Sequence, residues 1–430
     1  MLDIKFIRSN PDIVQKAIDL KRKAVKQDIG AILALDAEVQ TLNKQWEDLN
    51  SQKNRNASGG QGIEAGRAIK EQLQGVQSQL DKVRGILTEK LLKLPNIPSE
   101  DTPIGESEKE NTVLRKVGEI PTFNFTPLPH EEIGKRLGII DTETASMVAG
   151  SRFNYLKGDG ALLEFALTNY AMSVLTNSEI LKQIANEAGL DQISTKPFVP
   201  VIPPNFIRPE VFQKMARLDP KDDRYYLPDD DLYLIGSAEH TLGSLHMNNT
   251  FNTDELPVRY IGYSSCFRRE AGTAGKDTRG ILRQHQFNKV EMVTFSDPEK
   301  SRMEHDFMVA IQEYLMKSLG LPYQVVLLCT GDMGIPNIRH VDIETWLPGQ
   351  DSYRETHSAD FNGDYQSRRL NTKFKSKDGK KGFVHMNDAT TFALGRMIIA
   401  VLENYQQQDG TVKVPGVLQK FMGKETISRL

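Results

Sequence analysis

The first hundred residues carry two apolar stripes at helical spacing. The first stripe steps by threes and fours through Ile32, Leu35, Val39, Leu42, Trp46 and Leu49. The second repeats that spacing through Ile69, Leu73, Val76, Leu80, Val83 and Leu87. Because a Gly-rich break at residues 56–60 separates two equal stripes, the pattern predicts an antiparallel coiled-coil hairpin. Arms of about 28 residues would reach ~40 Å. Two helices of an ordinary bundle are the alternative.

The pattern changes after Leu94-Pro-Asn-Ile-Pro98, where two prolines end the second helix. The polar stretch 99–111 is typical of a linker, and a mixture of helices and strands follows from about residue 115. A strand at 198–204 contains prolines, which confine it to a sheet edge or an interface. The chain of 430 residues therefore predicts an N-terminal helical domain (1–103) and an α+β domain (115–430).

Apolar–polar alternation at 258–267 and 286–295 predicts two strands joined by a Gly- and charge-rich loop of about ten residues. Side chains alternate faces, so Arg268 and Glu270 share one face, as do Arg283, Phe287 and Glu291. If the two faces coincide, they suit a flat, anionic, amine-bearing ligand. Guanidinium groups bind phosphate, an aromatic ring stacks on a base, and carboxylates accept from amino groups. A salt-bridged, exposed hairpin is the alternative.

Overall charge gives no sign of nucleic-acid binding, because 54 Lys and Arg are balanced by 57 Asp and Glu for a net charge of −3. The hairpin differs locally. Between residues 51 and 93, eight Lys and Arg face four acids, for a net charge of +4. A projecting basic rod could bind the phosphates of a helical RNA by shape. A solvated coiled-coil surface is the alternative.

Cysteine usage and hydropathy narrow the class of protein. Cys266 and Cys329 lie far apart without a CxxC motif, so we expect neither a disulfide framework nor a structural zinc site. The N-terminus lacks a basic region followed by an apolar run, so we expect no signal peptide. No stretch approaches the ~18 apolar residues that span a bilayer. We therefore expect a cytoplasmic protein without membrane contact.

Several motifs carry a resemblance to a known family. Phe267-Arg-Arg-Glu270 and Arg283-Gln-His-Gln-Phe287-x-Lys-x-Glu291 resemble motif 2 of class II aminoacyl-tRNA synthetases. The ending HQF-x-K-x-E resembles seryl-tRNA synthetases in particular. The likeness extends over nearly the whole chain, through residues 94–98, 328–333, 354–355, 393–396 and 403–406. The chain is accordingly identified as a member of that family.

The resemblance implies an ATP-dependent ligase. Such an enzyme activates L-serine to seryl-adenylate and transfers it to tRNA(Ser), with tRNA(Sec) as a further candidate acceptor. The implied fold is an antiparallel-sheet catalytic domain preceded by the coiled-coil arm, which would grip the long variable arm of the tRNA. The region near 198–204 would build the interface of a homodimer. ATP and Mg²⁺, without zinc, are the implied cofactors.

The resemblance also assigns roles in ATP binding and catalysis. Arg268 would bind the α-phosphate and Arg396 the γ-phosphate, and these two are the catalytic candidates; Glu270 and Phe287 would hold adenine. The remaining ATP-binding candidates are Arg269, Arg283, Glu355, Thr356, His357 and Ser358. A carboxylate and a hydroxyl three residues apart, Glu355 and Ser358, can share one Mg²⁺.

Two of these assignments have alternatives. Arg396 stands at the start of an apolar helix and could be a paired structural charge. His357 departs from the family's Glu-x-Ser-Ser and reads as a hydrogen-bonded neighbour more readily than as a ligand.

A second group is implied for serine. The family's Thr-x-Glu becomes Ser237-Ala238-Glu239, and Glu291 would accept from the ammonium or hydroxyl group, with Arg268 beside it. The late Asn-Gly-Ser or Asn-x-Thr element corresponds to a segment one residue longer, 387–391. Asn387 and Thr390 are its candidates, since Thr390 stands six residues before Arg396, and Thr391 is the alternative.

Two other classes compete with the synthetase. An amino acid ligase that loads a carrier protein would lack the long arm, which this chain keeps. An inactive RNA-binding paralogue should have lost an arginine or the metal carboxylate, yet Arg268, Arg396, Glu270 and Glu355 are all present.

Overall fold

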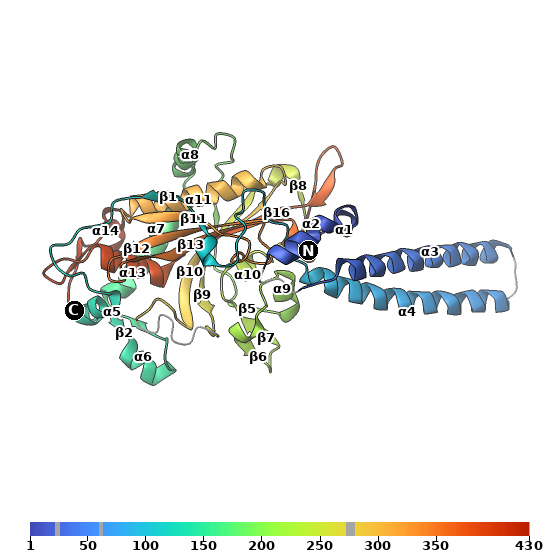
Figure 1. Cartoon of the computed structure of the whole chain (residues 1–430), viewed down its shortest axis with the longest axis horizontal. Helices are drawn as coiled ribbons and strands as arrows, with labels where there is room; N and C mark the ends of the chain where they lie inside the picture. The colour runs from blue at the N-terminus through green and yellow to red at the C-terminus, as the bar shows by residue number, and fades with distance from the viewer. Residues whose placement is uncertain (22–25, 60–62, 272–279, 430) are drawn as a thin grey trace.

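The computed structural model describes residues 1–21, 26–59, 63–271 and 280–429. A long helical hairpin projects from an α+β body (Figure 1). The hairpin consists of α3 (Ile29–Gly59) and α4 (Ile63–Lys93), each of 31 residues, which corresponds to ~46 Å. Helix α3 continues through most of the predicted break at 56–60, because Asn, Ala and Ser each cost well under ~1 kcal/mol in a helix. Residue 60 itself lies outside the described residues.

The hairpin buries the two predicted apolar stripes against each other. Leu42, Leu80 and Val83 form a cluster with the half-buried Leu35 and Val39. Near the body, a larger cluster adds the short helices α1 (Ile4–Ser9) and α2 (Pro11–Leu20) to the base of the hairpin. The predicted coiled-coil hairpin is therefore confirmed.

The body is built on one eight-stranded sheet. All neighbouring strands are antiparallel except the last pair, which is parallel. In spatial order the strands are β1 (Thr112–Val117), β11 (Tyr323–Leu327), β12 (Arg339–Leu347), β13 (Ser352–Gly363), β16 (His385–Ala393), β10 (Gln286–Ser296), β9 (Val258–Phe267) and β4 (Val199–Val201). The predicted α+β class is confirmed.

The two faces of the sheet have opposite character. One face packs against α7 (Asp159–Leu175), α11 (Ser301–Ser318) and α13 (Leu394–Asn404) around the main apolar core. On β12, Val341 and Ile343 belong to that core, whereas the alternating residues between and beside them are polar and line a cavity. The alternation of side chains along the strands thus gives the sheet an apolar face, which the helices cover, and a charged face, which lines the cavity.

Shorter elements surround the sheet. The remaining helices are α5 (His130–Leu137), α6 (Thr142–Ala149), α8 (Ser178–Glu187), α9 (Pro209–Lys214), α10 (Glu239–Leu242), α12 (Tyr365–Leu370) and α14 (Gly416–Met422). The remaining strands form small sheets. Two of these have three strands: β15 (Lys381–Phe383), β14 (Lys373–Lys375) and β8 (Thr250–Asn252) form one, and β5 (Phe206–Ile207), β7 (Leu232–Leu234) and β6 (Tyr226–Leu227) form the other. Two have two strands: β2 (Ile140–Asp141) pairs with β3 (Tyr155–Leu156), and β17 (Val412–Lys413) pairs with β18 (Thr426–Ile427).

The strands predicted at 258–267 and 286–295 are β9 and β10, paired along their whole length. Most of the predicted loop between them, 272–279, lies outside the described residues. The Pro-containing strand β4 lies at the sheet edge, as predicted. Among the described helices, none combines the length and apolar character required to cross a membrane.

The polar stretch 99–111 is fixed to the body rather than being a free linker. Asp101 forms ion pairs at 2.9 Å with Arg302 and with Arg339. The chain enters the sheet at Thr112, three residues before the predicted start of the second domain. The pattern in the sequence could not reveal this, because the partners of Asp101 lie some 200 positions away.

Candidate active site

The polar face of the sheet forms two adjoining cavities of about 900 and 210 Å³. Their shared wall includes Arg268, Glu355 and Arg396, three of the predicted residues. Arg283 and Ser358 also border both cavities. Glu239 lines only the larger cavity, and the smaller one adds Glu270, Phe287, Thr356 and Thr390. Residues from four separate stretches of the chain therefore meet at one place.

The β9–β10 hairpin brings the first group together. The Arg268 guanidinium lies over the ring of Phe287, 5.4 Å from its centroid, and its Nε donates to the Gly236 carbonyl at 3.2 Å. Arg283 forms an ion pair with Glu270 at 3.1 Å. Arg283 and Glu270 therefore form a salt bridge, as the alternative of a salt-bridged hairpin expected, but both residues border the smaller cavity. Glu270 itself adopts a left-handed backbone (φ 52°), a conformation that most side chains avoid.

A bulge explains how Glu355 and Ser358 share one face. On a regular strand, residues three apart point to opposite sides. In the β12–β13 ladder Glu344 pairs with Glu355 and the next pair is Ile343 with His357, so Thr356 is an extra residue. The extra residue shifts the alternation, and both Glu355 and Ser358 then face the cavity.

Arg396 pairs with Glu355 across the cavity wall. Its Nη1 donates to the Glu355 carbonyl at 2.7 Å and lies 3.2 Å from Oε2 of the same residue. Burial acts to raise the pKa of Glu355, but the Arg396 guanidinium outweighs burial, so the net pKa is lowered. Arg396 is therefore a paired charge, as the alternative interpretation of the sequence expected. The pair nevertheless lines the cavity, where phosphate oxygens could replace the carboxylate.

A second bulge decides between Thr390 and Thr391. In the β10–β16 ladder Val290 pairs with Phe392 and Glu291 with Thr390, which leaves Thr391 as the extra residue. The Thr390 hydroxyl lies 3.3 and 3.4 Å from the Glu291 carboxylate oxygens and 3.3 Å from the Ser358 hydroxyl. Thr390 is therefore the residue that reaches the cavity. Thr391 is the bulged residue at which the alternation of side chains shifts.

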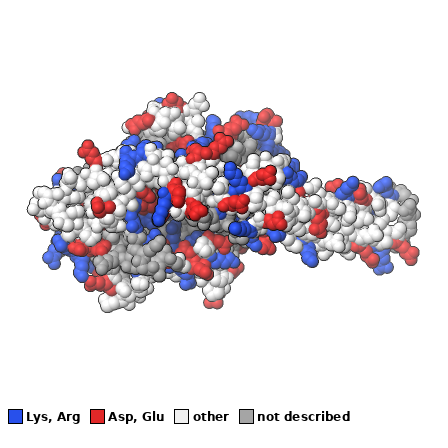
Figure 2. Space-filling model, in the orientation of Figure 1, with Lys and Arg blue, Asp and Glu red and all other residues white. Residues whose placement is uncertain are grey.

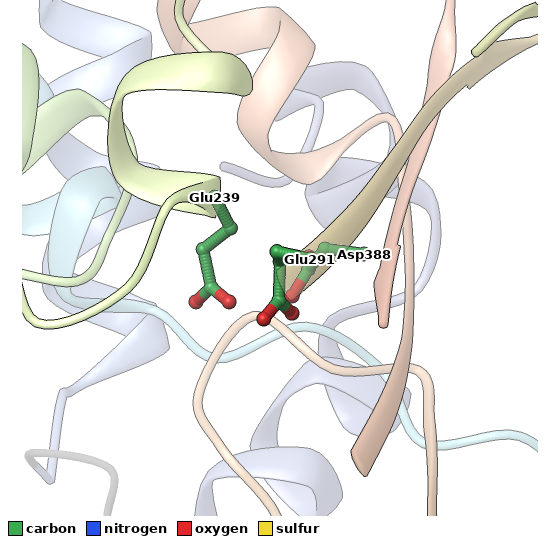
Figure 3. A group of neighbouring side chains, drawn as sticks. All are labelled: Glu239, Glu291 and Asp388. Carbon is green, nitrogen blue, oxygen red and sulfur yellow. The ribbon is translucent and has the colours of Figure 1, made fainter. Parts of the chain in front are cut away.

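Three buried carboxylates, of which Glu239 lines the larger cavity, converge on one another (Figure 3). Oxygens of Glu239, Glu291 and Asp388 lie within 4.8 Å of one another. Lys289 lies against this group: its Nζ is 2.9 Å from Glu291 Oε2 and donates to the Ser237 hydroxyl at 3.0 Å. That hydroxyl in turn donates to Glu239 Oε2 at 3.0 Å. Ser237, Glu239 and Glu291, all predicted, thus form one network.

The acids of this network titrate differently. Burial, together with the nearby charge of Glu239, raises the pKa of Glu291 to about 7 in spite of Lys289. Burial would also raise the pKa of Glu239, but Arg217 and Lys289 lower it to about 2. Burial and the neighbouring Glu239 raise the pKa of Asp388 well above its ordinary value. Two carboxylates in contact thus differ in charge near neutral pH.

Arg217 is the most prominent residue that sequence reasoning missed. It lies after α9, and its guanidinium forms ion pairs with three acids: Glu239 at 3.0 Å, Asp388 at 3.1 Å, and Asp360. Asp360 also lies 2.6 Å from His340 Nδ1, and the opposite ring nitrogen, Nε2, lies 2.7 Å from Asp342. A hint was available in the polar alternation of β12, His340-x-Asp342-x-Glu344, but nothing local marked Arg217.

Four predicted residues lie elsewhere. Arg269 points away from the cavity and covers the Tyr225 ring at 4.7 Å. His357 is fully buried on the helix side, where it contacts Phe392 edge to face and Nδ1 lies 2.8 Å from the Thr356 hydroxyl; burial lowers its pKa to about 3. The reading of His357 as a hydrogen-bonded neighbour therefore describes it.

The other two are Ala238 and Asn387. The Ala238 side chain belongs to an apolar cluster. Asn387 donates to the Ser301 carbonyl of α11 at 2.9 Å, on the face opposite the cavity. Its neighbour Asp388 takes the place expected for Asn387, because residues two apart, Asp388 and Thr390, share a face.

The donor chemistry favours a hard cation where a metal is concerned. Glu355 and Ser358 offer oxygen ligands on the cavity wall, which suits Mg²⁺. Over the described ranges, the one cluster of three potential ligands is Glu239, Glu291 and Asp388, and it consists of carboxylates that Lys289 and Arg217 already bind. Cys266 and Cys329 are buried free thiols, and burial raises the pKa of Cys266 to about 11.

Comparison with known proteins agrees with this geometry. Residues 1–98 match the family described as Seryl-tRNA synthetase N-terminal domain, and residues 224–405 match the tRNA synthetase class II core domain (G, H, P, S and T). A serine–tRNA ligase from Thermodesulfovibrio yellowstonii is 40% identical over 445 residues, covering 99% of this chain and 100% of the relative.

Two solved structures cover the whole chain. Seryl-tRNA synthetase from Pyrococcus horikoshii, complexed with ATP, superimposes with a TM-score of 0.88 at 35% identity and covers 100% of both chains. The cytoplasmic enzyme from Naegleria fowleri, in complex with AMP, gives a TM-score of 0.86 at 30% identity, covering 100% of this chain and 99% of the other.

Proposed function

The chain belongs to the seryl-tRNA synthetase family of class II aminoacyl-tRNA synthetases, and on that premise we propose how its cavity joins serine to tRNA at the expense of ATP. The observation that carries the proposal is the position of Arg268. It lines both cavities, with the acid network on one side and the Glu355–Arg396 pair on the other. One fixed positive charge thus faces both an amine-binding and a phosphate-binding region.

Adenylate formation requires positioned charge more than proton transfer. A serine carboxylate oxygen attacks the α-phosphorus, a new P–O bond forms, and the bond to pyrophosphate breaks. Arg268 binds the α-phosphate as its charge is redistributed, and Arg396 binds the γ-phosphate after exchanging its carboxylate partner. Phe287 and Glu270 hold the adenine by stacking and hydrogen bonding.

Mg²⁺ would be held by Glu355 and Ser358. When bound, the ion neutralises phosphate charge and so assists departure of pyrophosphate. The bulge at Thr356 supplies the only unusual geometry that this pair requires, since it places a carboxylate and a hydroxyl three residues apart on one wall.

Serine would occupy the acid network. Glu239 stays ionised and suits the ammonium group, Glu291 and Thr390 suit the hydroxyl group, and Arg268 suits the carboxylate. Ser237 connects Glu239 to Lys289 and so orients both. Buried groups shaped for a hydroxyl reject an analogue that lacks it, because they would remain unpaired.

The N-terminal domain, 1–103, would bind the tRNA, and the domain from about residue 112 would carry catalysis. Basic side chains along α3 and α4 are exposed, and Figure 2 displays them interspersed with acidic ones. The exposed basic residues are Lys44, Lys53, Arg55, Arg67, Lys70, Lys82, Arg84 and Lys93. A rigid rod bearing them is suited to phosphates along a helical RNA.

We further propose a homodimer. Large apolar side chains are exposed on three stretches of the body: Val199 and Ile202 at β4, Phe165 on α7, and Met147 on α6 are 53, 86, 60 and 80% exposed. Exposed apolar surface of this kind is typical of protein interfaces. A Phe165→Glu variant should sediment as a monomer, whereas the parent chain should sediment as a dimer.

Pyrophosphate exchange tests the function. With Mg²⁺, exchange should depend on serine and on none of the other nineteen amino acids. Charging of tRNA(Ser) and tRNA(Sec) transcripts then defines the acceptors. A zinc-selective chelator should leave the rate unchanged when Mg²⁺ is in excess. Exchange without tRNA charging would favour the carrier-protein ligase, and binding of tRNA without exchange would favour the inactive paralogue.

A further inference from the structure

Arg217 connects the proposed serine subsite to the central strands. Its three partners come from three elements: Glu239 from α10, Asp360 from β13 and Asp388 from β16. Its side chain is 17% exposed and lines the larger cavity. No other guanidinium in the described part of the chain has ion pairs to three acids at the cavity.

The acids around Arg217 need a countercharge wherever one of them is ionised, as Glu239 is. Oxygens of Glu239, Glu291 and Asp388 lie within 4.8 Å of one another, and all three residues are buried. Like charges at that distance repel strongly in a medium of low dielectric constant. Lys289 forms its ion pair with Glu291, so Arg217 provides the countercharge that contacts Glu239 and Asp388.

The main chain at Arg217 is also held in place. Arg224 donates from Nε and Nη2 to the Arg217 carbonyl at 3.2 and 3.0 Å. Both carboxylate oxygens of Glu239 have a partner. Oε1 forms the ion pair with Arg217, and Oε2 accepts a hydrogen bond from the Ser237 hydroxyl. These contacts fix the Glu239 carboxylate relative to Thr390 and Glu291 on the sheet.

We propose that Arg217 is a positioning residue for the amino acid substrate: it fixes the Glu239 carboxylate at the place where the substrate ammonium binds. The proposal rests on the function proposed above. The zwitterionic amino acid carries one ammonium group. Arg217 already balances part of the charge of Glu239, and the charge that remains is enough to bind that ammonium group. Arg217 thereby acts through Glu239 and contacts no reacting atom.

Steady-state exchange kinetics test the proposal. In Arg217→Ala, KM for serine should rise about 10- to 100-fold, on the order of losing one close charge pair, while KM for ATP stays within about threefold. Arg217→Lys keeps the charge but not the fork, so it should recover part of the loss. Arg115→Ala is the matched control, because it removes a guanidinium ion-paired with Glu313 away from the cavity and should leave both constants unchanged.

A double variant separates positioning from packing. Removing the Asp360 charge in Arg217→Ala/Asp360→Asn lowers the repulsion on Glu239, so KM for serine should fall below that of Arg217→Ala alone. Equal rises in the KM values for serine and ATP, no rise at all, or no recovery in the Lys and double variants would overturn the proposal. If Arg217→Ala does not fold, Arg217→Lys alone decides by the same split. Absence of serine-dependent exchange in the parent chain would instead overturn the proposed function.

Discussion

The arm and the cavity use charge in opposite ways. On α3 and α4 the basic side chains stand in water around a narrow apolar seam formed by Leu42, Leu80 and Val83. In the cavity, charged groups such as Arg217, Glu239 and Glu291 are removed from water and held by one another. Exposed charges attract weakly, at long range, and in a salt-dependent way. Buried charges act strongly, over a few ångströms, and depend on exact partners.

The difference implies a division of labour. Binding a long, flexible polyanion requires many replaceable contacts, which the arm offers. Discriminating serine from other amino acids and stabilising a transferring phosphoryl group requires few contacts that cannot be replaced. Single changes should therefore be severe in the cavity and mild on the arm.

Arg268→Ala should give the largest effect. It removes a preorganised positive charge from the cavity wall, and loss of such a donor lowers kcat by about 10²–10³. The measurement is serine-dependent pyrophosphate exchange. Arg269→Ala is the matched control, because that neighbouring side chain covers Tyr225 outside the cavity, and its kcat should remain within about threefold of the parent chain. Equal losses in both variants would show that the site assignment is wrong.

Deletion of residues 43–80, closed by a short Gly/Ser turn, should affect only the tRNA step. The base of the hairpin and its cluster with α1 and α2 remain, so the body should fold and exchange should persist. Charging should fall by roughly two orders of magnitude, since several phosphate contacts are lost together. An armless chain that charges tRNA as well as the full-length chain would remove the arm from the proposed function.

The same contrast explains what sequence could predict. The hairpin follows from a local repeat, and β9 and β10 follow from local alternation, so both were predictable. The shared position of Glu355 and Ser358 depends on a bulge at Thr356, and that of Thr390 depends on a bulge at Thr391. Resemblance supplied these residues where alternation alone would have separated them.

Long-range pairing was beyond reach. Arg217 meets Asp388 across 171 positions, and nothing in the residues around Arg217 indicates that partner. Asn387 was misplaced for a related reason: one step along a strand reverses the face of a side chain, so Asp388, and not Asn387, shares a face with Thr390 and contacts Arg217. Local patterns thus define elements, whereas the charge network of the site arises only when the elements are assembled.

The cavity should impose a pH dependence near neutrality. Burial raises the pKa of Glu291 from an ordinary 4.5 to about 7, so the carboxylate gains a proton as the pH falls through that value. If serine binding needs the ionised form, kcat/KM for serine should fall about tenfold per pH unit below 7. Glu239, with a pKa of about 2, stays ionised throughout. Residual activity in Glu291→Gln should lose this acid limb, and a limb that persists would assign it to another group.

A single change on the arm should give the smallest effect. Lys70 is exposed on α4, four residues before Gln74. Lys70→Ala should weaken tRNA binding only a few-fold and reduce the slope of log K against log salt by about one, because one fewer counterion is released. Filter binding across a range of salt concentrations measures both quantities.

Lys135→Ala is the control for that measurement. Lys135 is also exposed, but it lies on α5 of the body and forms an ion pair with Glu143 at 2.6 Å, so its removal should change neither affinity nor slope. A tenfold or larger loss from Lys70→Ala alone would show that the arm, like the cavity, relies on irreplaceable contacts. In that case the RNA would be read at defined positions, and the contrast between rod and cavity would be one of location and not of physical principle.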